Sequence, residues 1–134
     1  MPKHFLAYLL FALSFSIPAV AANETKPEII YYGFDSDIVT NYISTNRRSV
    51  GFIRVVVELM LDNKSYLPLA EHHEPLILDT IIDTFSQQPE TTIKSLLGRE
   101  EIRKEVLYKI QKRMQDETGK DVVRDVLFTK YLYQ

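Results

Sequence analysis

The sequence predicts an α+β fold, in which an antiparallel sheet carries two helices on one face and the elements follow the order βββααβ. Three observations predict it. Apolar residues alternate with polar ones through Val50–Asp62, which is the pattern of a half-buried strand. Two later stretches, 71–87 and 98–118, repeat apolar residues at intervals of three and four, which is helical spacing. The chain then closes on a β-branched and aromatic segment, Asp121–Gln134, so a last strand returns to the sheet after the helices.

Length and composition indicate one ordinary globular domain. The chain has 134 residues, of which 46% are hydrophobic and 25% are charged, with a formal net charge of −2. This charge excludes a nucleic-acid binder that works through a strong positive field. The sequence contains no cysteine, so the domain folds on its apolar core without disulfides.

The N-terminus has the features of a secretory signal peptide. A short basic start precedes the uncharged apolar run Phe5–Ile17, and Pro18–Ala22 supplies an Ala-x-Ala exit. We therefore expect residues 1–22 to be a signal peptide and residues 23–134 to be the exported domain. The alternative is an uncleaved anchor, because residues 5–22 are uncharged and reach the lower limit of length for a membrane-spanning helix. Either interpretation places the remaining chain outside the cytoplasm.

The first three predicted strands leave one sheet face mixed in character. Glu28–Phe34 and Ile38–Ile43 are rich in β-branched and aromatic residues, and Asp35–Asp37 is predicted as a turn between them. The third strand commits one face to a core, and its opposite face carries Arg54 and Glu58. Because both helices are expected to cover the apolar face, we expect the face with Arg54 and Glu58 to stay open as an interaction surface. The residues committed to the core are Ile53, Val55, Val57, Leu59 and Leu61.

Proline and glycine set the limits of the two predicted helices. The first helix is expected over Glu71–Gln87 and ends before Pro89. Glu90–Leu97 is expected to be a connector with at most one helical turn. The second helix is expected over Gly98–Thr118, and Gly119 is placed where a left-handed residue commonly ends a helix.

The closing segment is predicted to occupy an interior position in the sheet. It is apolar on both sides through its middle, which is the pattern of a strand with neighbours on every side. The even positions on one side are Val122, Val126, Phe128 and Leu132, and the odd positions on the other are Val123, Leu127, Tyr131 and Tyr133. Tyr131 and Tyr133 are either interface anchors or core residues on this pattern alone.

Catalytic and metal-binding chemistry finds little support in the sequence. His72 and His73, flanked by Glu71 and Glu74, are the one cluster that resembles a metal site. Adjacent histidines on a helix point about 100° apart, so polar residues at a helix start are the favoured interpretation over a zinc site. The chain has no nucleophile elbow and no glycine-rich phosphate loop. We therefore expect no enzyme activity, no cofactor, and no catalytic or metal-ligating residue.

Three motifs together resemble those of the flagellar basal-body-associated FliL family. The third strand contains Val57-Glu58-Leu59, and a helix start that reads His-x-Pro-Leu from His73 is followed by a charged helix from Gly98. The chain then ends in Asp125–Gln134, and family members typically close with hydrophobic-Phe-Thr-x-aromatic-x-x-Gln. The resemblance covers roughly residues 28–134.

The resemblance implies a non-catalytic protein of the bacterial flagellar motor. Such a protein supports the stator during flagellar rotation in swimming, swarming and chemotaxis. Its periplasmic domain resembles the stomatin/prohibitin (SPFH) fold and forms a homo-oligomeric ring, in contact with the basal body and with the periplasmic region of a MotB-type stator subunit. The residues of the family motif and of the expected interface are Arg54, Glu58, Phe128, Thr129, Tyr131, Tyr133 and Gln134.

The front of the chain departs from the family pattern. Family members are usually held in the inner membrane by one helix, whereas the apolar run here resembles a cleavable signal. The sequence is compatible with both a free periplasmic form and a membrane-associated form. The alternative function is a soluble periplasmic peptide-binding or assembly-chaperone module unrelated to the motor, using the open sheet face. A third function, a small metal-dependent hydrolase, depends on the histidine pair alone.

Overall fold

The computed structural model describes residues 26–46 and 48–134, so the predicted signal peptide lies outside the described residues. The described part is an antiparallel sheet with helices on one face, which confirms the predicted α+β class. The predicted order βββααβ is incomplete, because more helical elements lie between the third and the last strand. The elements are β1 (Ile30–Gly33), β2 (Ile38–Tyr42), β3 (Gly51–Leu61), a 3₁₀ helix (Lys64–Tyr66), α1 (Leu67–His72), α2 (Glu74–Ser86), α3 (Glu90–Lys94), α4 (Leu96–Thr118) and β4 (Val123–Tyr133).

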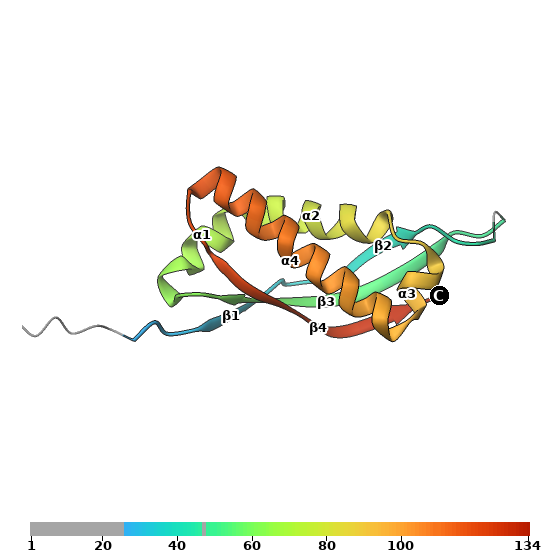
Figure 1. The fold of residues 1–134 in the computed structure, drawn as a ribbon, viewed down its shortest axis with the longest axis horizontal. Helices are drawn as coiled ribbons and strands as arrows, with labels where there is room; N and C mark the ends of the chain where they lie inside the picture. Colours follow the sequence, from blue (N-terminus) through green and yellow to red (C-terminus); the bar gives the residue numbers. More distant parts are fainter. Residues whose placement is uncertain (1–25, 47) are drawn as a thin grey trace, which may run out of the picture.

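The central strand of the sheet is β3, and its two edges are occupied differently (Figure 1). On one edge β4 pairs with β3 from Ile53, opposite Tyr133, to Leu61, opposite Val123. On the other edge β1 pairs with the second half of β3, and β2 pairs with the first half. Both of these pairings are antiparallel, so β1 and β2 are two segments of one interrupted edge strand.

Residues 34–37 interrupt this edge strand. These four residues on the edge face only two residues of β3, Val56 and Val57, so two extra residues bulge out of the ladder. The chain keeps its direction across the interruption. The turn predicted at Asp35–Asp37 is therefore a break within one edge of the sheet.

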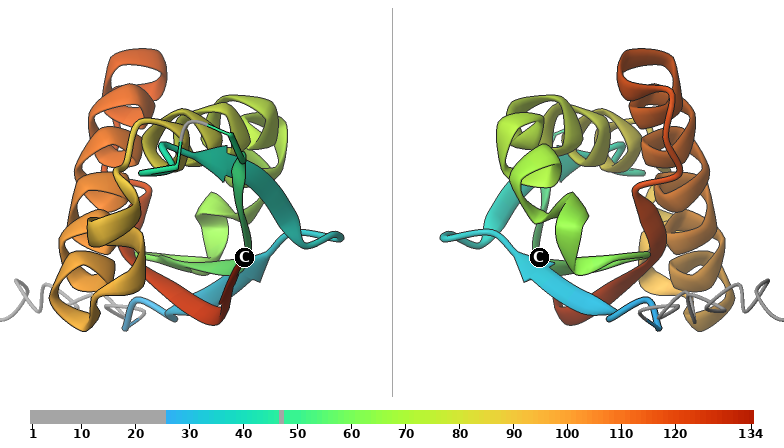
Figure 2. Two further views of the ribbon diagram at one scale, coloured as in Figure 1. Left: turned by 90° about the vertical axis from the view of Figure 1, so that its right-hand side faces the viewer. Right: turned by 90° about the vertical axis from the view of Figure 1, so that its left-hand side faces the viewer.

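The helices cover only one face of the sheet. In Figure 2 α2 lies above the strongly twisted sheet, beside β2, and α4 stands along one flank of the sheet, beside β4. The five alternating apolar residues predicted as core in β3 are each at most 1% exposed. Buried residues of α2 and α4, including Phe85 and Met114, belong to the same core cluster. The opposite sheet face, which carries Arg54, is left open as predicted.

The closing strand is an edge strand, so the predicted interior position is wrong. β4 pairs only with β3, and two bulges shift its alternation. The register passes over Arg124 and again over Thr129, and each skipped residue moves the following side chains to the other face. The simple even and odd faces therefore do not exist in β4. The side chains on the helix-covered side are Val123, Val126, Phe128, Tyr131 and Tyr133.

The helix boundaries differ from the predicted ones for local reasons. The first predicted helix is two helices that meet at His73, because Pro75 has no N–H to continue the hydrogen bonding of α1. The expected connector contains the short helix α3. The long helix begins at Leu96, where the side chain of Ser95 caps it, and not at Gly98. Its end at Gly119 is as predicted, with φ of 69° in the left-handed region.

The last residue is fixed to the first part of β3. The backbone N–H of Gln134 donates to the carbonyl oxygen of Phe52 at 2.9 Å, and the Tyr42 hydroxyl donates to the Gln134 carbonyl oxygen at 2.6 Å. The Tyr42 ring is 3% exposed and lies flat over Gly51, where an added Cβ would come within 2.2 Å of the ring. Glycine at position 51 therefore makes room for the side chain that fastens the chain end.

We predict that Gly51→Ala lowers the free energy of unfolding by about 1–3 kcal/mol, because the new methyl group displaces the buried Tyr42 ring. Gly33→Ala is the matched control, since its Cβ would meet nothing closer than 3.8 Å. Urea unfolding of both variants measures the difference. Equal stability of the two variants would contradict the packing of Tyr42 on Gly51.

Candidate functional site on the open face of the sheet

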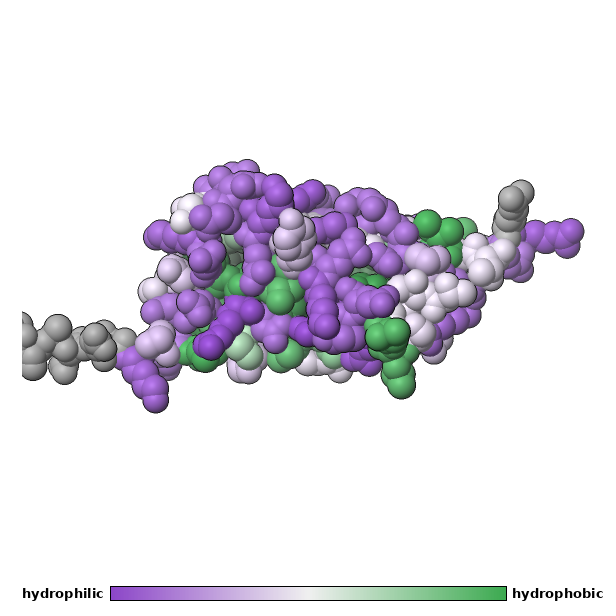
Figure 3. Space-filling model, in the orientation of Figure 1, coloured by the Kyte–Doolittle hydropathy of each residue, from purple (hydrophilic) through white to green (hydrophobic). Residues whose placement is uncertain are grey.

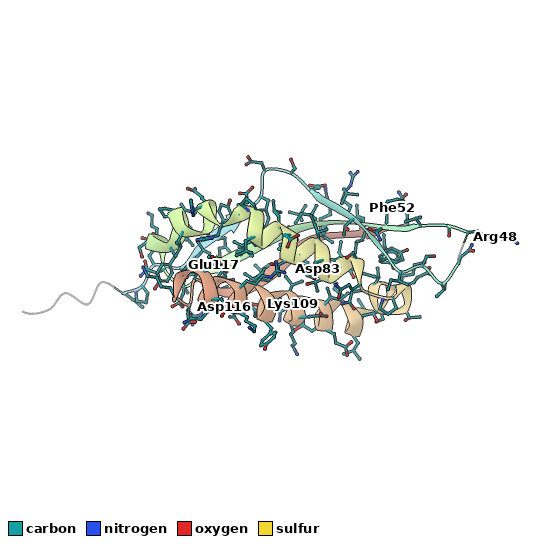
Figure 4. The ribbon with its side chains drawn as sticks, turned by 90° about the horizontal axis from the view of Figure 1, so that it is seen from above. Arg48, Phe52, Asp83, Lys109, Asp116 and Glu117 are labelled. Carbon is teal, nitrogen blue, oxygen red and sulfur yellow. The ribbon has the colours of Figure 1, made fainter. Side chains whose placement is uncertain are left out.

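We call the sheet surface not covered by helices the open face. It is formed by the side chains of alternate β3 residues and of their register partners on the neighbouring strands. Figure 4 shows the molecule from the helix side, with Asp83 and Lys109 over the helices and Phe52 at the strand end. Aromatic and aliphatic side chains make up most of the open face. Its residues are Tyr31, Val39, Asn41, Phe52, Arg54, Val56, Glu58, Met60, Asp125, Leu127, Lys130 and Leu132.

One end of the open face is a concave apolar surface, which we call the apolar end. Val39, Phe52 and Leu132 are 54%, 50% and 58% exposed, and they come from three neighbouring strands. Together with Arg54 and Gln134 they line a hollow of about 370 Å³. Adjoining half-exposed apolar side chains around a hollow make this end a candidate surface for another molecule to cover.

An ion pair crosses the middle of the open face. Lys130 on β4 and Asp37 beside β2 lie 2.9 Å apart, and the row between them passes over Val56 on β3. Both side chains are more than a third exposed, so this pair contributes little to stability. Its effect is positional, because it separates the apolar end, with Arg54, from the half that contains Glu58.

The structure places Arg54 and Glu58 on the same face but does not bring them together. They lie four residues apart on β3, about 13 Å along the strand. Among the described residues neither one forms an ion pair. Two charges of opposite sign on either side of an apolar strip can orient a partner, although they cannot act on one atom.

The aromatic residues of the closing motif belong mainly to the core side. Phe128 is 9% exposed and packs against Phe85, with the ring centroids 5.4 Å apart. The Tyr131 hydroxyl donates to the carbonyl oxygen of Ile93 at 3.0 Å, and burial raises the pKa of Tyr131 to about 12. Tyr133 is 44% exposed at the rim of the molecule. The sequence left Tyr131 as either an interface anchor or a core residue, and its placement supports the core interpretation.

Thr129 and Gln134, the remaining residues of the closing motif, influence the open face through their backbone positions. Thr129 is the exposed residue of a β4 bulge, so it sets which way the following side chains point. Gln134 holds the chain end against Phe52 and contributes to the apolar end. These residues shape the open face through the register of β4.

A row of side chains on α4, which the sequence pattern did not predict, covers the outer edge of β4. Arg99 donates to the Phe128 carbonyl oxygen at 2.9 Å, Arg103 to that of Val126 at 3.1 Å, and Gln111 to that of Val123 at 2.9 Å. We call these contacts the α4–β4 seam. Its members are spaced by multiples of four along the helix, which is the signal in the sequence that could have revealed them.

Further contacts strengthen the seam. The Arg99 guanidinium lies 4.8 Å from the centroid of the Tyr131 ring. Arg103 also binds Glu100 and Asp125, and the hydrogen bond with Glu100, opposed by partial burial, raises the pKa of Arg103 above its ordinary value. Because these side chains occupy the outer carbonyl groups, this part of β4 cannot accept another strand.

The histidine pair lacks the partners of a metal site. The rings of His72 and His73 lie edge to face, with centroids 5.0 Å apart, at the junction of α1 and α2. Within residues 26–46 and 48–134, no group of three or more potential ligands is close enough to hold a metal ion. None of the helices in the same ranges combines the length and the apolar composition needed to cross a bilayer.

The geometry defines the class of the molecule as a small α+β domain that presents an apolar, charge-flanked sheet face. The model of the family "Flagellar basal body-associated protein FliL" matches residues 31–134. A relative named "Flagellar protein FliL" from Aquifex aeolicus (strain VF5) is 29% identical over 115 residues, which cover 85% of this chain and 68% of the relative. The chain belongs to the FliL family of flagellar basal-body-associated proteins. The family predicted from the sequence motifs is thereby confirmed.

We predict that Arg99→Met lowers the free energy of unfolding by about 1–3 kcal/mol, because it removes a charged donor to a backbone carbonyl and the stacking on Tyr131. Lys104→Met is the matched control on the same helix, since Lys104 is exposed and only reaches Glu100 at 3.9 Å. Its effect should stay within about 0.5 kcal/mol. Thermal or urea unfolding compares the two, and equal losses would refute the seam.

Proposed function

We propose that this protein is exported to the periplasm and supports the flagellar stator at the basal body, as a non-catalytic binding protein. The membership of the FliL family supports the flagellar role. The apolar end of the open face is the observation that carries the binding role. It joins half-exposed Val39, Phe52 and Leu132 to the charge of Arg54 on one firm sheet.

The mechanism we propose is mechanical. A sheet anchored by helices on its far side keeps the apolar end in a fixed shape, so little conformational entropy is lost when a partner binds. The partner is the periplasmic region of a stator subunit, and its docking segment presents apolar side chains with an acidic residue opposite Arg54. By holding the stator subunit, the domain supports rotation in swimming, swarming and chemotaxis.

The proposal includes self-association and export. We propose that copies of the domain, which resembles the SPFH fold, form a ring around the stator. Residues 1–22 carry the export signal, as a cleaved peptide or as an inner-membrane anchor. Either form presents the same domain at the periplasmic side of the basal body.

A second candidate function is a periplasmic peptide-binding or assembly-chaperone module unrelated to the motor. The outer edge of β2 favours it, because the alternation of an antiparallel ladder points the backbone groups of Val39 and Asn41 away from β3. An extended peptide can add to such an edge beside the apolar end. Deletion of the gene separates the two functions, since only the motor protein is needed for normal motility.

We predict that the double variant Phe52→Thr/Leu132→Thr reduces swarming and swimming toward the level of a deletion strain. Threonine keeps the strand propensity but removes the apolar surface of the hollow. Tyr108→Gln is the control, because Tyr108 is 65% exposed on the helical side and should leave motility unchanged. Motility in soft agar and the melting temperature of each purified variant are the measurements. A folded double variant with full motility would refute docking through the apolar end.

A further inference from the structure

Two leucines project from the corner between α3 and α4. Leu96 and Leu97 are 88% and 71% exposed, although both belong to a regular helix. Figure 3 shows the resulting apolar projection beside the start of α4, on a surface that is otherwise mostly hydrophilic in this view. We call this pair the leucine knob. Exposing two adjoining leucine side chains to water is unfavourable, so another surface is expected to cover them.

The leucine knob is held in position before any partner arrives. The Ser95 side chain accepts a hydrogen bond from the Gly98 N–H at 2.9 Å, and Gly98 lies so close to the Thr92 carbonyl that a Cβ would come within 2.1 Å of it. Glu90 fixes α3 by accepting hydrogen bonds from Lys94 and Thr45. These bonds lower the pKa of Glu90 to about 2. A rigid knob loses little entropy on binding.

A complementary hollow lies where the edge strand is interrupted. We call it the edge hollow; its volume is about 330 Å³, and it opens between residues 34–39 and α2. Apolar side chains that include Phe34, Leu78 and Ile82 line it, together with Asp35 and Asp37. The bulge of two extra residues in the ladder creates this space beneath α2.

The charges around the two features are opposite. The residues that line the edge hollow include the carboxylates of Asp35, Asp37 and Glu74, of which Asp37 is paired with Lys130. Arg99 and Arg103 lie beside Leu96 together with Glu100, and Lys94 is paired with Glu90, so the surroundings of the leucine knob keep a net positive charge. The N-terminal end of α4 adds its positive dipole. A basic-flanked apolar projection and an acid-rimmed apolar hollow match in both charge and polarity.

The two features also lie on opposite flanks of the molecule. Figure 2 shows α4 on one flank, while the connection between β1 and β2 projects from the other. A contact between them cannot be made within one chain, nor by two copies related through a self-complementary patch. It repeats head to tail, with each copy offering its knob to one neighbour and its hollow to the other.

We propose that the leucine knob of one copy inserts into the edge hollow of the next copy, and that this heterologous contact is the unit of self-association. The inference rests on the proposed self-association and names its interface. The contact is adjacent to the apolar end of the open face, because Val39 lines both the edge hollow and the hollow of the apolar end.

The absence of cysteine allows a direct test with the full-length chain. Leu97→Cys and Ile82→Cys variants are purified separately, mixed, and treated with a short bis-maleimide cross-linker. The expected result is a dimer in the mixture and little dimer with either variant alone. Tyr108→Cys mixed with Ile82→Cys is the control for random collision, since Tyr108 is exposed on α4 away from the knob.

Dimers from Leu97→Cys alone, or a mixed yield no higher than the Tyr108→Cys control, would overturn the proposal. A second readout is the sedimentation of Leu96→Ser/Leu97→Ser, which removes exposed side chains only and should shift the chain to monomer. Unchanged self-association of this folded variant would also overturn it. Motility enters neither measurement, so failure of the interface and failure of the stator role are distinguishable.

Discussion

The pairing of β4 along nearly the full length of β3 is the constraint on which the rest of the structure depends. It places the last residue, Gln134, back beside Phe52 and so closes the sheet with the final segment of the chain. The seam from α4 fastens the same strand from outside through Arg99 and Arg103. A strand held on both sides positions α4, and α4 in turn holds α2 on the same sheet face.

The two faces of the sheet therefore differ in what covers them. The helices satisfy the apolar face of the sheet and present charged side chains outward, so the helical side is solvated. The open face has no such cover and keeps an apolar end around Phe52. The proposed stator contact uses this end, whereas the proposed contact between copies uses the leucine knob and the edge hollow. The two surfaces are adjacent, because Val39 lines both the edge hollow and the hollow of the apolar end.

The local sequence pattern predicted most of the helices and strands. The remaining features depend on how the strands pair with one another. The alternation around Val55 gave the central strand and its open face with Arg54, because β3 is unbroken and a period of two holds throughout. The same rule failed for β4, since the bulges at Arg124 and Thr129 reverse the alternation and depend on pairing with β3. The edge hollow could likewise not be predicted from the sequence, because it arises from the strand register on either side of residues 34–37. Of the candidate residues, Arg54 and Glu58 followed from alternation alone, while the apolar end required the alignment of three strands.

The central claim is that the apolar end of the open face contacts the stator in the working motor. A photoreactive amino acid at position 52 in motile cells tests it most directly, with the same probe at position 108 as the reference. Irradiation should join the probe at 52, and not the probe at 108, to a stator subunit that mass spectrometry identifies. Cross-linking of the stator subunit from 108 alone, or from neither position, would rule out this contact.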